Sequence, residues 1–126
     1  MQARPDIGGT TFCVDIIDVM TFDDDGKIYE RLASLYLDND QFEQCVEAAD
    51  GALDKGGLRS PESMYVVRGM CQYNMDDMTA ARESFVSCRN ESRRADDETN
   101  RRICQQWITY LDNEQQREEQ LQRAAL

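Results

Sequence analysis

The stretch SPESMYVVRGMCQYNMDDMTAARESF, Ser60–Phe85, decides the fold of this 126-residue chain. Serine followed by proline is typical of a helix start, because serine caps free backbone N–H groups and proline suits the first helical position. Apolar residues then recur at three- and four-residue intervals, which predicts a helix that ends where Asn74–Asp77 breaks the pattern. The intervals resume at Met78, Ala81, Phe85 and Cys88. The stretch therefore predicts two helices joined by a short turn.

The residues after Lys27 show the same three- and four-residue intervals. A strand in this place would carry Glu30 and Ser34 on its apolar face, so a helix is favoured. A second amphipathic helix follows over about residues 41–53. It is expected to end at Lys55-Gly56-Gly57, where a cation is followed by glycines able to cap a helix.

The two helix pairs repeat one another. Phe42 opens the second helix of the first pair, and Met78 lies 36 positions later at the same point of the second pair. Small residues, Ala33 and Gly69, fall where the paired helices would approach closely. This pattern resembles that of tetratricopeptide-repeat proteins, whose usual period is about 34 residues. The resemblance covers about residues 27–89 and implies an α-solenoid of antiparallel helix pairs, one over 27–54 and one over 60–89.

A finer resemblance concerns the segment LDKGGLRSPESMYVVRGMCQYNMDDMTAARESF and the later QQWITYLD. Both are similar to the closing part of periplasmic tetratricopeptide proteins of proteobacteria that are associated with TonB energy-transduction systems. In that family a final helix solvates the end of the array, which implies a capping helix and polar tail over residues 96–126. Asp96 or Asp97 can cap its start. Its apolar side comprises Ile103, Cys104, Trp107, Ile108 and Leu111. Past Asp112 the sequence is almost wholly polar, so an exposed helical extension or a frayed tail is predicted.

Residues 12–22 alternate between two faces and are rich in β-branched side chains, which predicts a short β-strand before the helices. The stretch FCVDIIDVMTFDDDGKI resembles the penultimate strand and following turn of the ketosteroid isomerase family. The resemblance places Asp18 where those enzymes carry a protonated oxyanion-hole acid. The general base and tyrosine donor of that family belong to a portion with no counterpart in this sequence, so no catalysis is expected. Residues 1–26 are thus interpreted as a strand and acidic turn, joined to the repeats by natural fusion or in an engineered chimera.

The acidic turn Asp23–Gly26 does not match a calcium loop. With Gly26 at the sixth position of an EF-hand loop, the first position would be Thr21 and the twelfth Leu32, neither of which is acidic. An ordinary turn is favoured instead, with Gly26 free to take a positive φ. No metal site and no cofactor are expected.

Histidine is absent, and five cysteines are scattered without a CxxC pair. The absence of histidine excludes Ser–His and Cys–His nucleophile pairs and any zinc site that contains histidine. Cysteine spacings of 32, 26, 17 and 16 residues favour unpaired thiols that act as small buried apolar side chains. Unpaired thiols indicate a reducing compartment such as the cytoplasm, whereas the family resemblance implies the periplasm. The sequence leaves both compartments open.

The formal net charge of −11 disfavours nucleic acids and anionic membranes, and it favours basic or apolar partners. No apolar run approaches the roughly 20 residues of a membrane span. The repeats are therefore expected to form a non-catalytic binding or scaffold module whose concave groove takes a basic or amphipathic peptide. The predicted groove residues are Lys27, Glu30, Ser34 and Leu37 from the first pair, and Ser63, Val66, Met70, Tyr73 and Asn74 from the second.

A lone strand at residues 12–22 would leave a row of backbone donors and acceptors unpaired. Pairing with the same strand of a second chain would satisfy both, and two repeats are fewer than the three usually needed for stability. A homodimer formed by strand pairing is therefore expected. The alternatives are a truncated or engineered chimera without activity of its own, and a remnant of a ketosteroid-isomerase-like enzyme.

Overall fold

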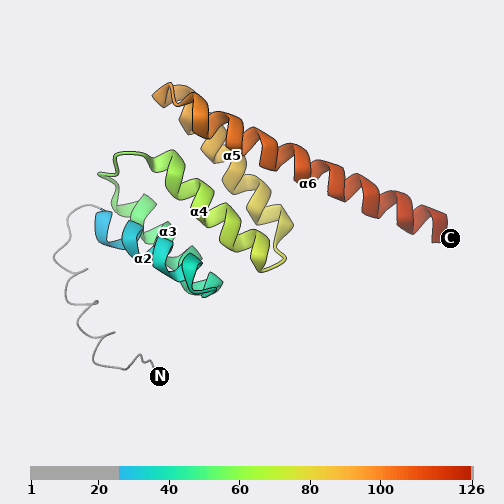
Figure 1. Cartoon of the computed structure of the whole chain (residues 1–126), viewed down its shortest axis with the longest axis horizontal. Helices are drawn as coiled ribbons and strands as arrows, with labels where there is room; N and C mark the ends of the chain where they lie inside the picture. Colours follow the sequence, from blue (N-terminus) through green and yellow to red (C-terminus); the bar gives the residue numbers. More distant parts are fainter. Residues whose placement is uncertain (1–25, 126) are drawn as a thin grey trace.

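The computed structural model describes residues 26–125, which form five α-helices that pack in chain order (Figure 1). The helices are α2 (Lys27–Asp38), α3 (Phe42–Lys55), α4 (Pro61–Asn74), α5 (Met78–Ala95) and α6 (Glu98–Ala125). Each helix packs chiefly against the next along the chain, while α4 also touches both α2 and α6. The described part of the chain is therefore a mainly helical stack in which α2, α4 and α6 are neighbours on one face.

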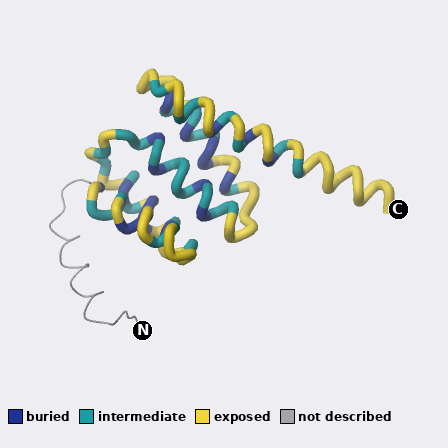
Figure 2. Tube along the Cα trace, viewed as in Figure 1, coloured by how far each residue is buried: buried dark blue, intermediate teal, exposed yellow. Residues whose placement is uncertain are grey.

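The predicted helices are confirmed, although α5 continues to Ala95, beyond the predicted end of the second repeat at position 89. The predicted extension past Asp112 is helical, because α6 continues to Ala125. These last turns of α6 project beyond the other helices and are exposed (Figure 2). None of the described helices combines the length and apolar character needed to cross a membrane.

The predicted strand at residues 12–22 lies outside the described residues, as do Asp18 and the acidic turn up to Asp25. The strand-paired homodimer depends on the same segment. These points stay predictions. Within residues 26–125 there is no strand.

Three of the interhelical turns contain an aspartate in the left-handed conformation. These residues are Asp40, Asp76 and Asp96, with φ of 60°, 62° and 59°. In each turn the next N–H donates to the carbonyl five residues earlier: Gln41 to Tyr36, Asp77 to Gln72, and Asp97 to Ser92. This bond closes a helix end in the manner of a Schellman motif, and aspartate tolerates the conformation better than bulkier residues. The turns at Asp40 and Asp76 are 36 residues apart, which agrees with the predicted internal repeat.

The connection between α3 and α4 contains glycines instead. Gly56 and Gly57 have positive φ values of 76° and 71°, as the predicted glycine cap requires. The positive φ predicted for Gly26 is wrong, because its φ is −86°. Gly26 is confined by close approach: a Cβ there would lie 2.3 Å from the carbonyl oxygen of Ala52. Its N–H donates to the Gly56 carbonyl at 2.6 Å, which joins the start of α2 to the end of α3.

The core consists of two clusters. The first joins α2, α3 and the start of α4 and contains Leu32, Ala33, Ala48, Ala49, Ala52 and Met64. The second joins α5 and α6 and contains Ala81, Phe85, Cys88, Cys104, Ile108 and Leu111. Side chains of α4 pack against both clusters, so α4 is the central element of the stack.

Two disulfides correct the prediction of unpaired thiols. Cys45 of α3 is bonded to Cys71 of α4, and Cys88 of α5 to Cys104 of α6, with Cα–Cα distances of 6.4 and 6.1 Å. All four side chains are fully buried, so the prediction of buried sulfur is confirmed while that of free thiols is wrong. Because disulfides persist in oxidising compartments, the pairing favours such a compartment over the cytoplasm.

Candidate functional site

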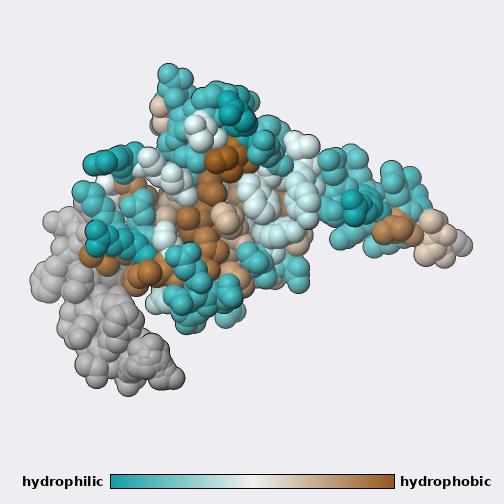
Figure 3. All heavy atoms as spheres, viewed as in Figure 1, coloured by the Kyte–Doolittle hydropathy of each residue, from teal (hydrophilic) through white to brown (hydrophobic). Residues whose placement is uncertain are grey.

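A groove of about 480 Å³ lies between α2 and α4. Glu30 and Ser34, both predicted groove residues, line its α2 side, and the predicted Ser63 lines its α4 side. The other lining residues are Arg31, Leu35, Met64 and Val67. Figure 3 shows hydrophobic side chains gathered across the middle of the face that α2, α4 and α6 share. The groove is thus an apolar surface with carboxylate, guanidinium and hydroxyl groups around it. We refer to it as the α2–α4 groove.

Three other predicted groove residues, Val66, Met70 and Tyr73, pack instead against the second core cluster beside Trp107 of α6. The helical period accounts for the division, because positions 63 and 67 share one face of α4 while 66, 70 and 73 share another. The sequence prediction placed all of the groove residues of this helix on one face that is open to a partner. Besides α3 and α5, the structure gives this helix two further neighbours, α2 and α6.

The remaining predicted residues do not line the α2–α4 groove. Leu37 is half-buried, and Asn74 is exposed with its side-chain amide donating to the Met70 carbonyl at 2.8 Å. Lys27 forms the first residue of α2 and is exposed.

Sequence reasoning missed Arg31, Leu35, Met64 and Val67. Their place in the sequence could have indicated them, because Arg31, Leu35 and Met64 directly follow the predicted groove residues Glu30, Ser34 and Ser63. Leu35 is one of the apolar residues that recur at three- and four-residue intervals after Lys27, a pattern that predicts a packed side chain, yet 55% of its surface is exposed.

An aromatic cluster joins α4, α5 and α6. The Phe85 and Trp107 rings are stacked with centroids 4.8 Å apart, and Tyr73 meets Trp107 edge-on at 5.2 Å. The hydroxyl oxygens of Tyr73 and Tyr110 are 3.0 Å apart. The hydrogen bond with Tyr110 is the main cause that raises the pKa of Tyr73, followed by burial and by the negative charges of nearby carboxylates. The cluster fixes α6 against the centre of the stack.

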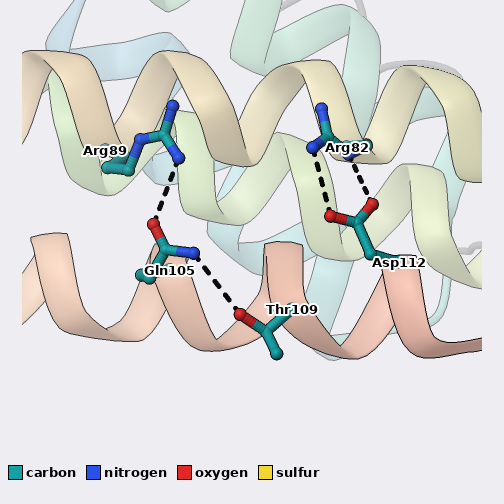
Figure 4. A network of polar contacts seen from close by, with 5 residues as sticks. All are labelled: Arg82, Arg89, Gln105, Thr109 and Asp112. Atoms are coloured by element: carbon teal, nitrogen blue, oxygen red, sulfur yellow. Dashed lines mark hydrogen bonds and ion pairs between the residues drawn. The ribbon is translucent and has the colours of Figure 1, made fainter.

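Polar contacts continue the α5–α6 interface toward solvent (Figure 4). Arg82 donates from two nitrogens to the two carboxylate oxygens of Asp112, at 2.8 and 3.2 Å. Arg89 donates to Gln105 at 3.1 Å, and Gln105 donates to Thr109 at 3.4 Å. The Asp112 partner raises the pKa of Arg82, whereas Arg82 lowers that of Asp112.

A carboxyl pair, buried Glu62 and half-buried Asp97, connects the start of α4 to the start of α6. Glu62 is only 3% exposed, and burial raises its pKa, with a further contribution from the hydrogen bond and charge of Asp97. The pKa of Asp97 is lowered because the backbone N–H and side-chain amide of Asn100 both donate to it. Of the two carboxyl groups, Glu62 is therefore the one that stays protonated to the higher pH. Asn100 also donates to Ser63 at 3.3 Å, which links this pair to the α2–α4 groove.

Comparisons with protein-family models, curated proteins and solved structures gave no match to this chain. The tetratricopeptide and ketosteroid isomerase resemblances therefore stay predictions. Within residues 26–125, no three side chains able to ligate a metal lie close together.

Proposed function

We propose that this chain is a non-catalytic protein-binding module of tetratricopeptide type, in which the α2–α4 groove binds a basic or amphipathic peptide segment. The observation that carries the proposal is the groove itself, which combines exposed Leu35 with half-buried Val67 and places Glu30 at its edge. An apolar anchor from a partner would bury surface there, and the net charge of −11 would attract its cations. The disulfides and the family resemblance together favour action in the periplasm.

The proposal also includes self-association through residues 12–22, as predicted from the sequence. The rival hypotheses are an inactive chimera and an isomerase remnant. The latter depends on Asp18 alone.

The groove can be tested with two leucine variants and a fluorescein-labelled amphipathic lysine–leucine peptide. Leu35→Ala removes an exposed side chain from the groove, and we expect roughly tenfold weaker binding because burial of a leucine contributes on the order of 1–3 kcal/mol. Leu121→Ala is the matched control, since Leu121 is 63% exposed on α6 and is not among the groove residues. Fluorescence anisotropy measures the peptide affinity of both variants and of the wild type. Equal affinities for wild type and Leu35→Ala would refute the α2–α4 groove as the binding site.

A further inference from the structure

A second groove, of about 560 Å³, lies where α6 parts from α5. The two helices are antiparallel, since Arg82 pairs with Asp112 and Arg89 with Gln105. This register places Met78, the first residue of α5, opposite position 116 of α6. Residues 117–125 consequently continue beyond α5, as Figure 1 shows. We call the space beside this overhang the corner groove; its lining includes Tyr73, Met78, Glu83, Tyr110, Glu114 and Glu118.

Aromatic rings and a methionine thioether line the corner groove. Tyr73 and Tyr110 contribute two phenol rings whose hydroxyl oxygens are 3.0 Å apart, and Met78 is 40% exposed. Ring faces attract cationic side chains, and a thioether packs well against the alkyl stem of lysine or arginine. This lining suits a side chain that is apolar along its length and charged at its end.

The charge of the corner groove is negative. Glu83, Glu114 and Glu118 all line it. Arg82 is the one cation among the lining residues, and Asp112 neutralises it through two hydrogen bonds. Arg117 reaches Glu114 at 3.6 Å, but its side chain is 72% exposed, so solvent screens this pair. The negative charges of Glu114 and Asp76 also contribute to the raised pKa of Tyr73, a sign that the field extends to the floor of the groove.

We propose that the corner groove is a docking site for a lysine- or arginine-rich segment of a partner protein, with a cationic side chain lying over the two tyrosines between the three glutamates. A second copy of this chain fits this groove less well, because the chain carries 14 basic residues against 25 acidic ones and so offers few cations to an acidic lining. The self-association proposed above uses a different segment, residues 12–22. The site lies between α5 and α6, away from the α2–α4 groove, so it extends the proposed function to a second surface. Either site can fail while the other holds.

The test uses hexalysine as the probe and the full chain labelled with 15N. Hexalysine should shift the amide resonances of residues 78–83 and 110–118, together with the indole N–H of Trp107, the only tryptophan, which meets Tyr73 edge-on. Replacing the three glutamates together, by Glu83→Gln, Glu114→Gln and Glu118→Gln, should weaken binding roughly tenfold.

A matched control removes the same charge elsewhere, through Glu43→Gln, Glu47→Gln and Asp54→Asn, three exposed positions on α3. This variant should bind hexalysine within about twofold of wild type. Tyr110→Leu keeps every charge and removes one ring, and it should weaken binding severalfold if the cation lies over the tyrosines. Circular dichroism of each variant verifies that the helices are retained.

Equal weakening by the two charge variants would overturn the proposal, since binding would then follow net charge alone. Shifts confined to the residues of the α2–α4 groove would also overturn it, as would the absence of any shift. A dimer in sedimentation that Tyr110→Leu converts to a monomer would show that a second copy occupies the corner groove, and it would equally refute the proposal.

Discussion

The two ends of the stack are held together by different kinds of side chain. At the α2–α3 end most of the buried residues are alanines, so the helix backbones approach closely and no single side chain dominates. At the α5–α6 end a buried phenylalanine stacks on tryptophan, two tyrosines meet the tryptophan edge-on, and charged side chains pair along the rim (Figure 4). The comparison teaches that one array can combine a close-approach interface with an interface filled by large rings. The first kind is sensitive to added atoms and the second to removed ones.

The largest effect is expected from Phe85→Ala. Phe85 is fully buried and stacks on Trp107 at 4.8 Å, so truncation leaves a cavity and should lower the free energy of unfolding by about 3–5 kcal/mol. At the other end Leu32→Ala should lower the free energy of unfolding by about 2 kcal/mol, because Leu32 lies among small residues and is still 8% exposed. Urea unfolding followed by circular dichroism measures both. A larger loss for Leu32→Ala would reverse the comparison.

Each disulfide stabilises one end of the stack, and removal of the two should lower the free energy of unfolding by slightly different amounts. Loop-closure entropy predicts a loss of about 3.5 kcal/mol for Cys45→Ala with Cys71→Ala, and about 3.1 kcal/mol for Cys88→Ala with Cys104→Ala. The difference arises because the sequence separations are 26 and 16 residues. Urea midpoints under oxidising conditions provide the measurement. Thiol titration of the denatured, unreduced protein should detect no more than one of the five cysteines, and detection of all five would contradict the pairing.

Gly51 and Gly69 each face an aromatic ring, so replacing each by alanine compares how the two ends of the stack tolerate an added Cβ. A Cβ at Gly69 would lie 2.7 Å from fully buried Phe85, so Gly69→Ala should cost about 1–3 kcal/mol through overpacking. A Cβ at Gly51 would lie 2.8 Å from the ring of Tyr29, which is only half-buried and therefore less confined than Phe85. Gly51→Ala should therefore change stability by less than about 1 kcal/mol, helped by the better helix propensity of alanine. The melting temperatures of the two variants and of the wild type measure both effects. Equal losses would show that the two rings are equally confined.

The smallest expected effect concerns pH and the Glu62–Asp97 pair. The folded-state pKa of Glu62 is raised above the ordinary value of 4.5, so its contribution to stability is complete below that value and is lost as the pH rises through the raised pKa. Glu62→Gln keeps a neutral side-chain donor at this position and should lose less stability than wild type as the pH rises above 4.5.

Glu98→Gln is the control for this prediction. Arg101 lowers the pKa of Glu98, so the carboxylate contributes stability above its ordinary pKa and loses it as the pH falls through the lowered one. Urea midpoints of both variants across the pH range should therefore differ from wild type in opposite directions. Parallel pH profiles for Glu62→Gln and wild type would show that the proton on Glu62 is not linked to folding.

Three of the nine predicted groove residues line the α2–α4 groove. These three residues are Glu30, Ser34 and Ser63, and the helical period places all of them outside the buried faces of their helices. Val66, Met70 and Tyr73 could not be separated from them, since a period describes the face of one helix and does not reveal which neighbour covers it. The corner groove depends on residues from α4, α5 and α6 and has no signature in any one segment.

The sequence by itself determined the helices, their turns and their order. Apolar spacing, caps and left-handed aspartates act within a few residues, so the ends of α3 at Gly56 and of α4 before Asp76 can be read directly from the chain. Only the tertiary structure decided the pairing of Cys45 with Cys71, the division of α4 between α2 and α6, and the opposite pKa shifts of Glu62 and Asp97. These features depend on the distance in space between side chains that are far apart in sequence, and packing of the helices fixes that distance.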